Sequence, residues 1–237
     1  MAALAGCATG AGTAGADGKP AATSSSNAGP LSSAGPLSSA SATPAGTTPS
    51  TATPAAPPPD SRARDLPALL TIPRIGVRDL RVVPYEGTTD DLPGTRIQDR
   101  GLAASPYGDA GGAGPGRTGN YLVTAHRLSA GGPLRDLPAL DDGDQVLVRH
   151  GDTVHEYRIT TTRKTSFRSE RSLAEQRAAV PGEPGAAPTR AMITLSTCAT
   201  PEDDAAGNFW RDDRGNPEHR IDKIGVLVAS RPAPPSR

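Results

Sequence analysis

The distribution of polar and apolar residues divides the chain near residue 65. Up to about residue 64 the sequence is almost entirely Ala, Ser, Thr, Gly and Pro, and the fragment GPLSSA occurs twice. Such a segment cannot bury enough apolar surface to offset the conformational entropy that it would lose on folding. We therefore predict a disordered tail over residues 1–64 and one folded domain over residues 65–237.

Beyond residue 65, short apolar runs separated by turn residues predict β-strands. Residues 144–149 and 154–161 alternate apolar and polar positions on either side of His150-Gly151-Asp152, a pattern typical of a hairpin. A strand over residues 69–77 contains Pro73 and is expected at a sheet edge, because proline cannot donate a ladder hydrogen bond. The other predicted strands cover residues 79–84, 120–125, 192–197 and 221–229.

Helical periodicity is weak, and residues 170–180 are the best candidate for a helix. Many short strands with turns between them indicate a mainly β fold that is closed, or nearly closed, into a barrel with short helices. Hydrophobic residues make up only 35% of the chain and aromatic residues 3%, which agrees with one small core.

Charge and hydropathy restrict the function. The 25 basic and 25 acidic residues are mixed along the second half, and no basic stripe with interleaved aromatic residues is present. Nucleic-acid binding is therefore not expected. The sequence also contains no apolar run of the length that a bilayer-spanning helix needs.

The two cysteines, Cys7 and Cys198, lie in different surroundings. Leu4-Ala5-Gly6-Cys7 resembles a bacterial lipobox, whose cysteine is lipidated after signal-peptide cleavage, but the basic and apolar segments that normally precede it are missing. The pattern is either the end of a truncated signal peptide, giving a membrane tether through the N-terminus, or chance. No CxxC pair or cysteine–histidine set has metal-ligand spacing, so we expect no metal and no cofactor.

Cys198 and His126 each follow a short predicted strand. Strand ends hold reactive groups rigidly and leave them accessible. A thiol is mostly protonated at neutral pH, and an imidazole can take its proton and later return it to a leaving amine. We therefore expect the two side chains to meet at one rim of the barrel. The alternatives are a buried structural cysteine and a rim histidine without a catalytic role.

Arg220 begins the last predicted strand. A guanidinium keeps its charge and offers several donors, so it suits the negative oxygen of a tetrahedral intermediate. The alternative is a surface arginine paired with Glu218 or Asp222. Thr197, directly before the cysteine, is a candidate for binding substrate or a plain strand residue. The acidic run over residues 202–204 is expected to be a solvated loop rather than a cation site.

Four segments resemble the sortase family of cysteine transpeptidases, and they follow one another along the chain in the family's order. Two carry the candidate residues: TLSTC at Thr194–Cys198 matches the sortase signature that ends in the nucleophile, and NYLVTAHR at Asn120–Arg127 is similar to the segment of the catalytic histidine. Ala125 stands where sortases usually have glycine. IPRIGV at Ile72–Val77 and PLRDLPALDDGDQVLV at Pro133–Val148 resemble two further sortase segments, and the resemblance covers about residues 69–230.

This resemblance implies an eight-stranded sortase β-barrel with a cysteine–histidine–arginine site, carried onto Cys198, His126 and Arg220. Family arginines usually lie closer after the cysteine, whereas residues 205–218 intervene here, so Arg211 and Arg214 are the runners-up. The chain is most similar to the class E sortases of actinobacteria, and class F is the nearest rival.

The resemblance also implies a substrate and a location. Surface proteins with a C-terminal sorting signal of the LPxTG or LAxTG type would be cleaved through a thioacyl-enzyme and joined to a peptidoglycan or pilin amine. The reaction would take place at the extracellular face of the cell membrane or in the cell wall, without a cofactor. Two alternatives stay open: a cysteine hydrolase that transfers nothing, and an inactive sortase-like surface module that only binds.

Overall fold

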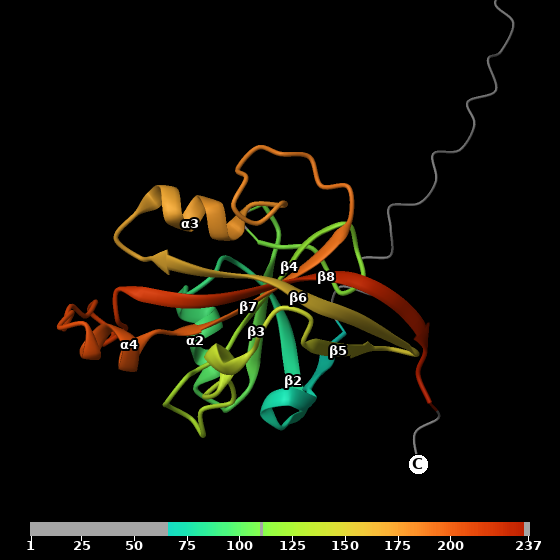
Figure 1. The fold of residues 1–237 in the computed structure, drawn as a ribbon, viewed down its shortest axis with the longest axis horizontal. Helices are drawn as coiled ribbons and strands as arrows, with labels where there is room; N and C mark the ends of the chain where they lie inside the picture. Colours follow the sequence, from blue (N-terminus) through green and yellow to red (C-terminus); the bar gives the residue numbers. More distant parts are fainter. Residues whose placement is uncertain (1–65, 110, 235–237) are drawn as a thin grey trace, which may run out of the picture. The chain divides into compact units, whose positions relative to one another are not determined.

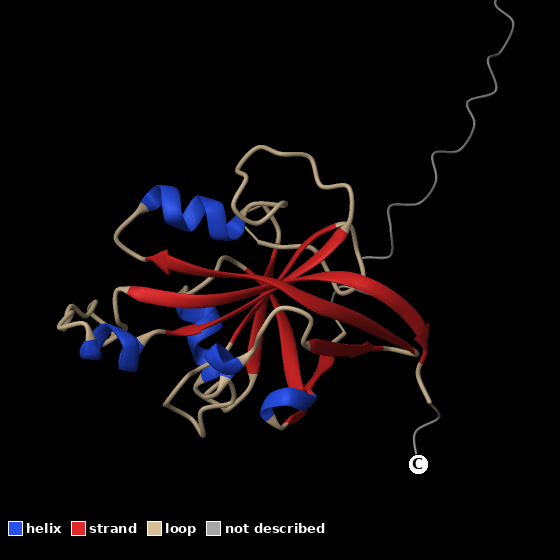
Figure 2. Ribbon diagram, in the orientation of Figure 1, coloured by secondary structure: helices blue, strands red, loops and turns tan. Residues whose placement is uncertain are grey.

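A computed structural model describes residues 66–109 and 111–234, and eight strands within these residues close into one barrel (Figures 1 and 2). The order around the barrel is β1-β2-β3-β4-β7-β8-β6-β5, and β5 pairs back onto β1. The strands are β1 (Ala68–Ile72), β2 (Val77–Glu86), β3 (Ala103–Tyr107), β4 (Gly119–Thr124), β5 (Gln145–His150), β6 (Thr153–Ser166), β7 (Ala191–Cys198) and β8 (His219–Pro232). The prediction of a mainly β, eight-stranded barrel is confirmed.

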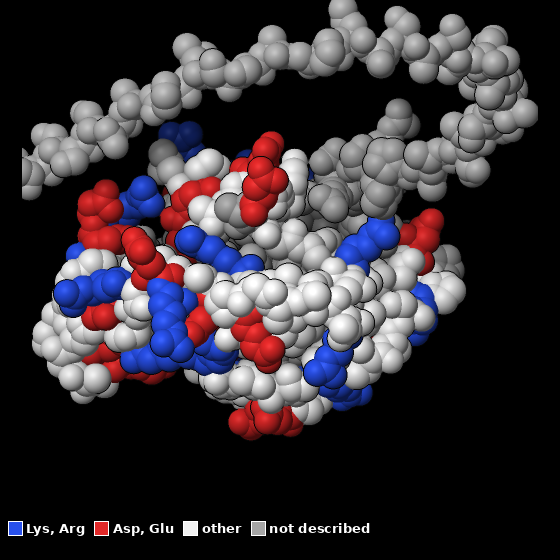
Figure 3. Space-filling model, turned by 90° about the horizontal axis from the view of Figure 1, so that it is seen from above, with Lys and Arg blue, Asp and Glu red and all other residues white. Residues whose placement is uncertain are grey.

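The predicted disordered tail, with Cys7 and the lipobox-like pattern, lies outside the described residues. The boundary between tail and domain therefore stays a prediction. Within the described residues, no helix is both long and apolar enough to cross a membrane. Basic and acidic side chains are interspersed on the face drawn in Figure 3.

Short helices fill several of the connections between strands. Asp91 caps the first α-helix by accepting a hydrogen bond from the Gly94 amide at 2.8 Å, and Ser169 caps the next helix by accepting one from the Ser172 amide. The second of these lies inside the predicted helical segment 170–180. The helices are η1 (Pro73–Ile75), α2 (Leu92–Gln98), η2 (Leu137–Ala139), α3 (Glu170–Arg177) and α4 (Thr200–Ala205).

The start of the barrel differs from the prediction in two ways. The first strand is not at an edge, because β1 pairs with both β2 and β5, and Pro73 lies after the strand in η1, where it removes no ladder hydrogen bond. The sequence reasoning also missed β3, whose residues ASPY carry only a weak strand signal. This strand pairs in parallel with β2 and meets β4 at a single pair, Ala104 with Thr124.

Alternate residues of the central strands face the barrel interior. On β4 and β7 the odd-numbered side chains belong to the core, and they are Tyr121, Val123, Ile193 and Leu195. Because successive strand residues point to opposite faces, the even-numbered side chains of both strands, including Cys198, point outwards. The outer face of β7 therefore carries the candidate nucleophile.

Candidate active site

Three neighbouring strands bring Cys198, His126 and Arg220 to one rim of the barrel. The strands β4 and β7 run parallel with Thr124 beside Ser196, so His126 and Cys198 each come two residues after this pair. The strands β7 and β8 are antiparallel, and Cys198 pairs with Arg220. Because neighbouring strands lie about 4.8 Å apart, the pairing puts all three residues at adjacent positions.

The same three residues line one narrow pocket of about 270 Å³, including its open mouth. The sequence placed the thiol and the imidazole on a common rim, and the structure brings both to this pocket together with the guanidinium. The remaining lining residues come from the β2–α2 connection, α2, the strand ends and the β7–β8 connection, and they are Asp90, Thr95, Gln98, Thr124, Ala125, Ser196, Thr197 and Asn216.

Cys198 is partly buried, at the end of β7. Burial raises the pKa of the Cys198 thiol, and the negative charges of Asp90 and Asp212 raise it further, whereas the positive charges of Arg220 and Arg127 lower it. A thiol in this environment needs a base before it can act as a nucleophile.

The His126 imidazole is oriented by a carboxylate that the sequence reasoning missed. Its Nε2 lies 2.9 Å from Oδ1 of Asp99, and the side chains of His126 and Asp99 are 15% and 60% exposed. Asp99 directly follows α2, in a connection without any periodic pattern that would have marked it. With Nε2 engaged, Nδ1 is the ring nitrogen that remains for proton transfer.

Arg220 is a buried residue, with 3% exposure. Its Nε and Nη2 donate to Oδ1 of Asp90 at 3.3 and 3.2 Å, and its guanidinium carbon lies 3.9 Å from the centroid of the Phe167 ring. The alternative of a surface arginine paired with Glu218 or Asp222 is therefore wrong, because both of those carboxylates have other partners.

The runner-up arginines do not line the pocket. Arg211 pairs with the carboxylate of Asp204, and Arg214 donates from Nη1 to the backbone oxygen of Asp90 at 3.3 Å. Arg220 is thus the one of the three candidates that the strand pairing brings beside the cysteine.

Thr197 lines the pocket and is buried, with 2% exposure. Its odd position in β7 turns its side chain to the core side, and its hydroxyl donates to the Ala125 backbone oxygen at 2.8 Å. This bond holds the chain just before His126. Contact between Thr197 and a substrate stays a prediction.

Arg127 joins the end of β7 to α4. It donates from Nη1 to the Cys198 backbone oxygen at 3.2 Å, and its two Nη atoms reach the Glu202 carboxylate at 3.1 and 3.0 Å. A bidentate arginine–carboxylate pair of this kind fixes both partners in one geometry. It therefore restrains the backbone that carries the thiol.

The acidic run over residues 202–204 is not the solvated loop that we expected. It belongs to α4, and Asp203 is fully buried, with its carboxylate 2.9 Å from Nδ1 of His219 and 3.0 Å from Nζ of Lys164. Glu202 and Asp204 pair with arginines. All three carboxylates therefore have cationic partners in the region after the cysteine.

The fold and the pocket together define a β-barrel protein with a cysteine, a histidine and an arginine at one rim. A family model described as the sortase domain matches residues 70–209, more than half of the chain. The chain therefore belongs to the sortase family. The match ends before Arg220, so the role of this residue depends on the geometry of the pocket.

Individual relatives agree with this family. The chain is 29% identical over 138 residues to sortase SrtE1 of Streptomyces coelicolor, a match over 57% of this chain and 36% of that protein. The chain thus spans about a third of the length of this curated relative.

Several solved sortase structures resemble the barrel. Sortase E of Streptomyces avermitilis is 25% identical with a TM-score of 0.51, covering 72% of this chain and 91% of that one. Sortase E1 of Streptomyces coelicolor, solved with a tripeptide in its active site, is 22% identical with a TM-score of 0.53 over 73% and 94%. SrtA of Actinomyces oris is 19% identical with a TM-score of 0.53 over 70% and 82%. The last two likenesses concern the fold alone.

Proposed function

We propose that this chain is a sortase-type cysteine transpeptidase in which Cys198 is the nucleophile, His126 the acid and base, and Arg220 the oxyanion stabiliser. The observation that supports this most is the single pocket that the three side chains line at the ends of β4, β7 and β8. Two strands pair directly at Cys198 and Arg220, so the nucleophile and the cation are fixed relative to each other by the sheet.

In the first half of the reaction, Nδ1 of His126 takes the thiol proton and the Cys198 thiolate attacks the threonine carbonyl of a C-terminal LPxTG-like or LAxTG-like sorting signal. The carbon–sulfur bond forms, and the negative oxygen of the tetrahedral intermediate is stabilised by Arg220. The intermediate collapses with breakage of the threonine–glycine amide bond, and His126 gives its proton to the leaving amine. A thioacyl-enzyme on Cys198 remains.

In the second half, a peptidoglycan or pilin amine attacks the thioester. The new amide bond forms, the carbon–sulfur bond breaks, and the proton lost by the amine passes through His126 to the sulfur. The net reaction exchanges one amide for another and needs no cofactor. Asp99 accepts the Nε2 proton of the imidazole and keeps Nδ1 available in both halves.

Within the family, we propose class E, with class F as the rival. The support is the likeness to SrtE1 and to the sortase E structures, together with the His219-Arg220 pair before the last strand. Sortases generally act at the cell surface, so we place this chain at the extracellular face of the membrane or in the cell wall, acting on surface proteins that carry a sorting signal.

The proposal is tested by incubating the protein with LPxTG and LAxTG peptides, with and without a glycine peptide as the amine, and identifying products by mass spectrometry. Transpeptidation predicts cleavage after threonine and a product joined to the glycine peptide, and Cys198→Ala should form neither. Release of the free acid alone would favour the cysteine hydrolase. No cleavage by wild-type protein would favour a module that only binds.

A further inference from the structure

Two of the three guanidinium nitrogens of Arg220 donate hydrogen bonds to the protein, and the third has no partner among the described residues. Nε and Nη2 both donate to the same oxygen of Asp90, and the ring of Phe167 lies against the guanidinium face. Nη1 is buried and has no hydrogen-bond partner within the part of the chain that the structure describes. Because buried guanidinium groups are normally satisfied, Nη1 is the donor that is free for a substrate oxygen.

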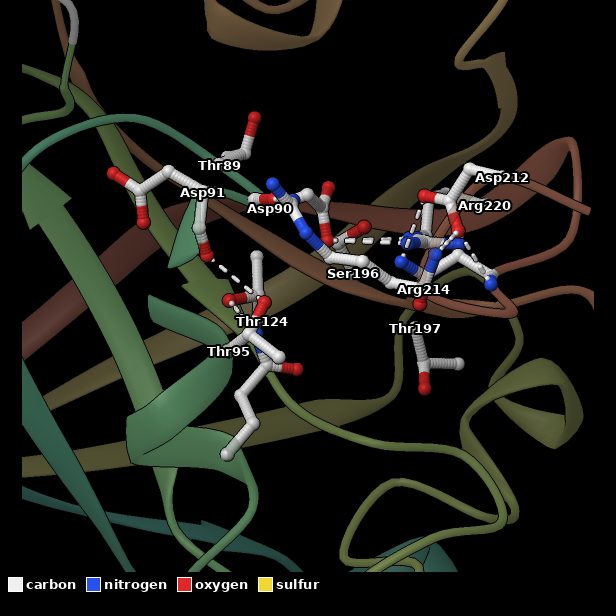
Figure 4. Close-up of polar contacts among 12 residues, drawn as sticks. Thr89, Asp90, Asp91, Thr95, Thr124, Ser196, Thr197, Asp212, Arg214 and Arg220 are labelled. Atoms are coloured by element: carbon white, nitrogen blue, oxygen red, sulfur yellow. Dashed lines mark hydrogen bonds and ion pairs between the residues drawn. The ribbon is translucent and has the colours of Figure 1, made fainter. Parts of the chain in front are cut away.

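Figure 4 shows Asp90 between Thr89 and Asp91, with its side chain beside Arg220, and both of these neighbours are held by other residues. Nε of Arg177 donates to the Thr89 hydroxyl at 2.9 Å, and Asp91 caps α2. The backbone of Asp90 has a φ of 65°, a left-handed conformation that a residue other than glycine keeps only where its surroundings determine it. The backbone that carries Asp90 is therefore held in place on both sides, and its carboxylate binds Arg220 through Oδ1, whereas the buried Oδ2 has no hydrogen-bond partner among the described residues.

We propose that Asp90 is a positioning residue of the transpeptidase: it holds one edge of the Arg220 guanidinium and thereby directs Nη1 to the oxyanion that forms at Cys198. The proposal rests on the proposed function, because it assigns a task to the same pocket. Because the Asp90 carboxylate is negatively charged, it also acts electrostatically on the thiol. The negative charge of Asp90 raises the pKa of the Cys198 thiol and opposes the ionisation that the reaction needs.

Asp90 should have opposite effects on two quantities: it should raise kcat by positioning Arg220 and lower the reactivity of the Cys198 thiol by its charge. A merely structural residue would not change the two in opposite directions. In Asp90→Asn the side-chain oxygen can still accept from Arg220 but carries no negative charge, so it holds the guanidinium more weakly, and we expect kcat for cleavage of an LAxTG or LPxTG peptide to fall by about 10- to 100-fold. The same change removes a negative charge near the thiol, so we expect the pKa of Cys198 to fall. Alkylation of Cys198 by iodoacetamide below that pKa should therefore become faster.

The matched control is Asp213→Asn, which removes a carboxylate from an exposed position on the β7–β8 connection and should change neither quantity. If Asp90 acts through Arg220, Asp90→Asn should cause no further loss of kcat in an Arg220→Ala background. Asp90→Glu keeps the charge and moves the carboxylate, so it should lower kcat and alter the alkylation rate less. This variant serves where Asp90→Asn does not fold, as judged by its thermal unfolding.

A rise of kcat in Asp90→Asn would overturn the proposal, because Asp90 would then obstruct the site. Full additivity with Arg220→Ala would overturn it as well. The alkylation profile needs no substrate, and an unchanged profile in Asp90→Asn contradicts the proposal independently. Failure of the wild-type protein to cleave any sorting-signal peptide is a different result, which rejects the proposed function itself.

Discussion

At the scale of single residues, the candidate chemistry depends on side chains that strands place at their ends. Cys198 and His126 each follow an apolar run, and Arg220 begins one, so the sequence pattern marked all three. The carboxylates that bind His126 and Arg220 are not marked by any such sequence pattern. Asp90 and Asp99 lie in the connection that also contains α2. Asp90 contacts Arg220, which lies 130 positions further along the chain, and Asp99 contacts His126, which lies 27 positions further along. Only the closed barrel brings these partners together.

Asp99 offers a direct test at this scale. Its carboxylate accepts the Nε2 proton of His126, and an asparagine oxygen can accept the same proton, whereas alanine cannot. We expect Asp99→Asn to lower kcat a few-fold and Asp99→Ala to lower it by about tenfold or more, because general acid–base catalysis requires an oriented ring. Peptide cleavage rates give the measurement. A wild-type kcat in Asp99→Ala would show that the imidazole needs no partner.

At the scale of elements, α3 is tied to the sheet by a buried polar network next to the pocket. Nε2 of Gln176 donates to the Asp222 carboxylate at 3.0 Å and to the Ser196 hydroxyl at 3.2 Å, and the Thr89 hydroxyl donates to Oε1 of Gln176 at 3.1 Å. One glutamine thus connects α3, β7, β8 and the connection that carries Asp90. The sequence predicted the helix, but its weak periodicity gave no sign that a polar residue is its buried contact.

The network predicts a pH-dependent loss of stability in Gln176→Glu. Burial raises the pKa of the Asp222 carboxyl, and a second carboxylate facing it must strengthen that shift. A carboxyl with a higher pKa in the folded protein binds its proton more tightly there. Its contribution to folding is thus complete at low pH and is lost as the pH rises through the folded-state pKa.

We therefore expect the free energy of unfolding of Gln176→Glu to be lower than that of the wild type by about 1–3 kcal/mol at pH 8, and by less at pH 5. Urea unfolding at both pH values measures the difference. Ala174→Glu adds a carboxylate at an exposed position of the same helix and is the control. Equal losses at the two pH values would contradict the account of the network.

At the scale of the whole molecule, the short strands and turns were enough to predict a closed barrel, because alternating and short apolar runs have few other packings. The sequence pattern did not predict the features that depend on closure of the barrel, namely β3 and the two partners of β1. The strand β3 is held between β2 and β4 despite its weak sequence signal, and β1 has partners on both sides despite Pro73. The pocket likewise depends on closure, since β4, β7 and β8 become neighbours only in the barrel.

The central claim is that this rim carries out acyl transfer through the sulfur of Cys198. The most direct measurement is the intact mass of the protein after incubation with an LAxTG or LPxTG peptide without an amine acceptor, followed by digestion to locate the added mass. We expect an acyl group that ends in threonine on Cys198. Hydroxylamine should remove it, as it removes a thioester, and Cys198→Ala should not carry it. Cleavage of the peptide by Cys198→Ala at the wild-type rate, or an adduct on any other residue, would contradict the central claim.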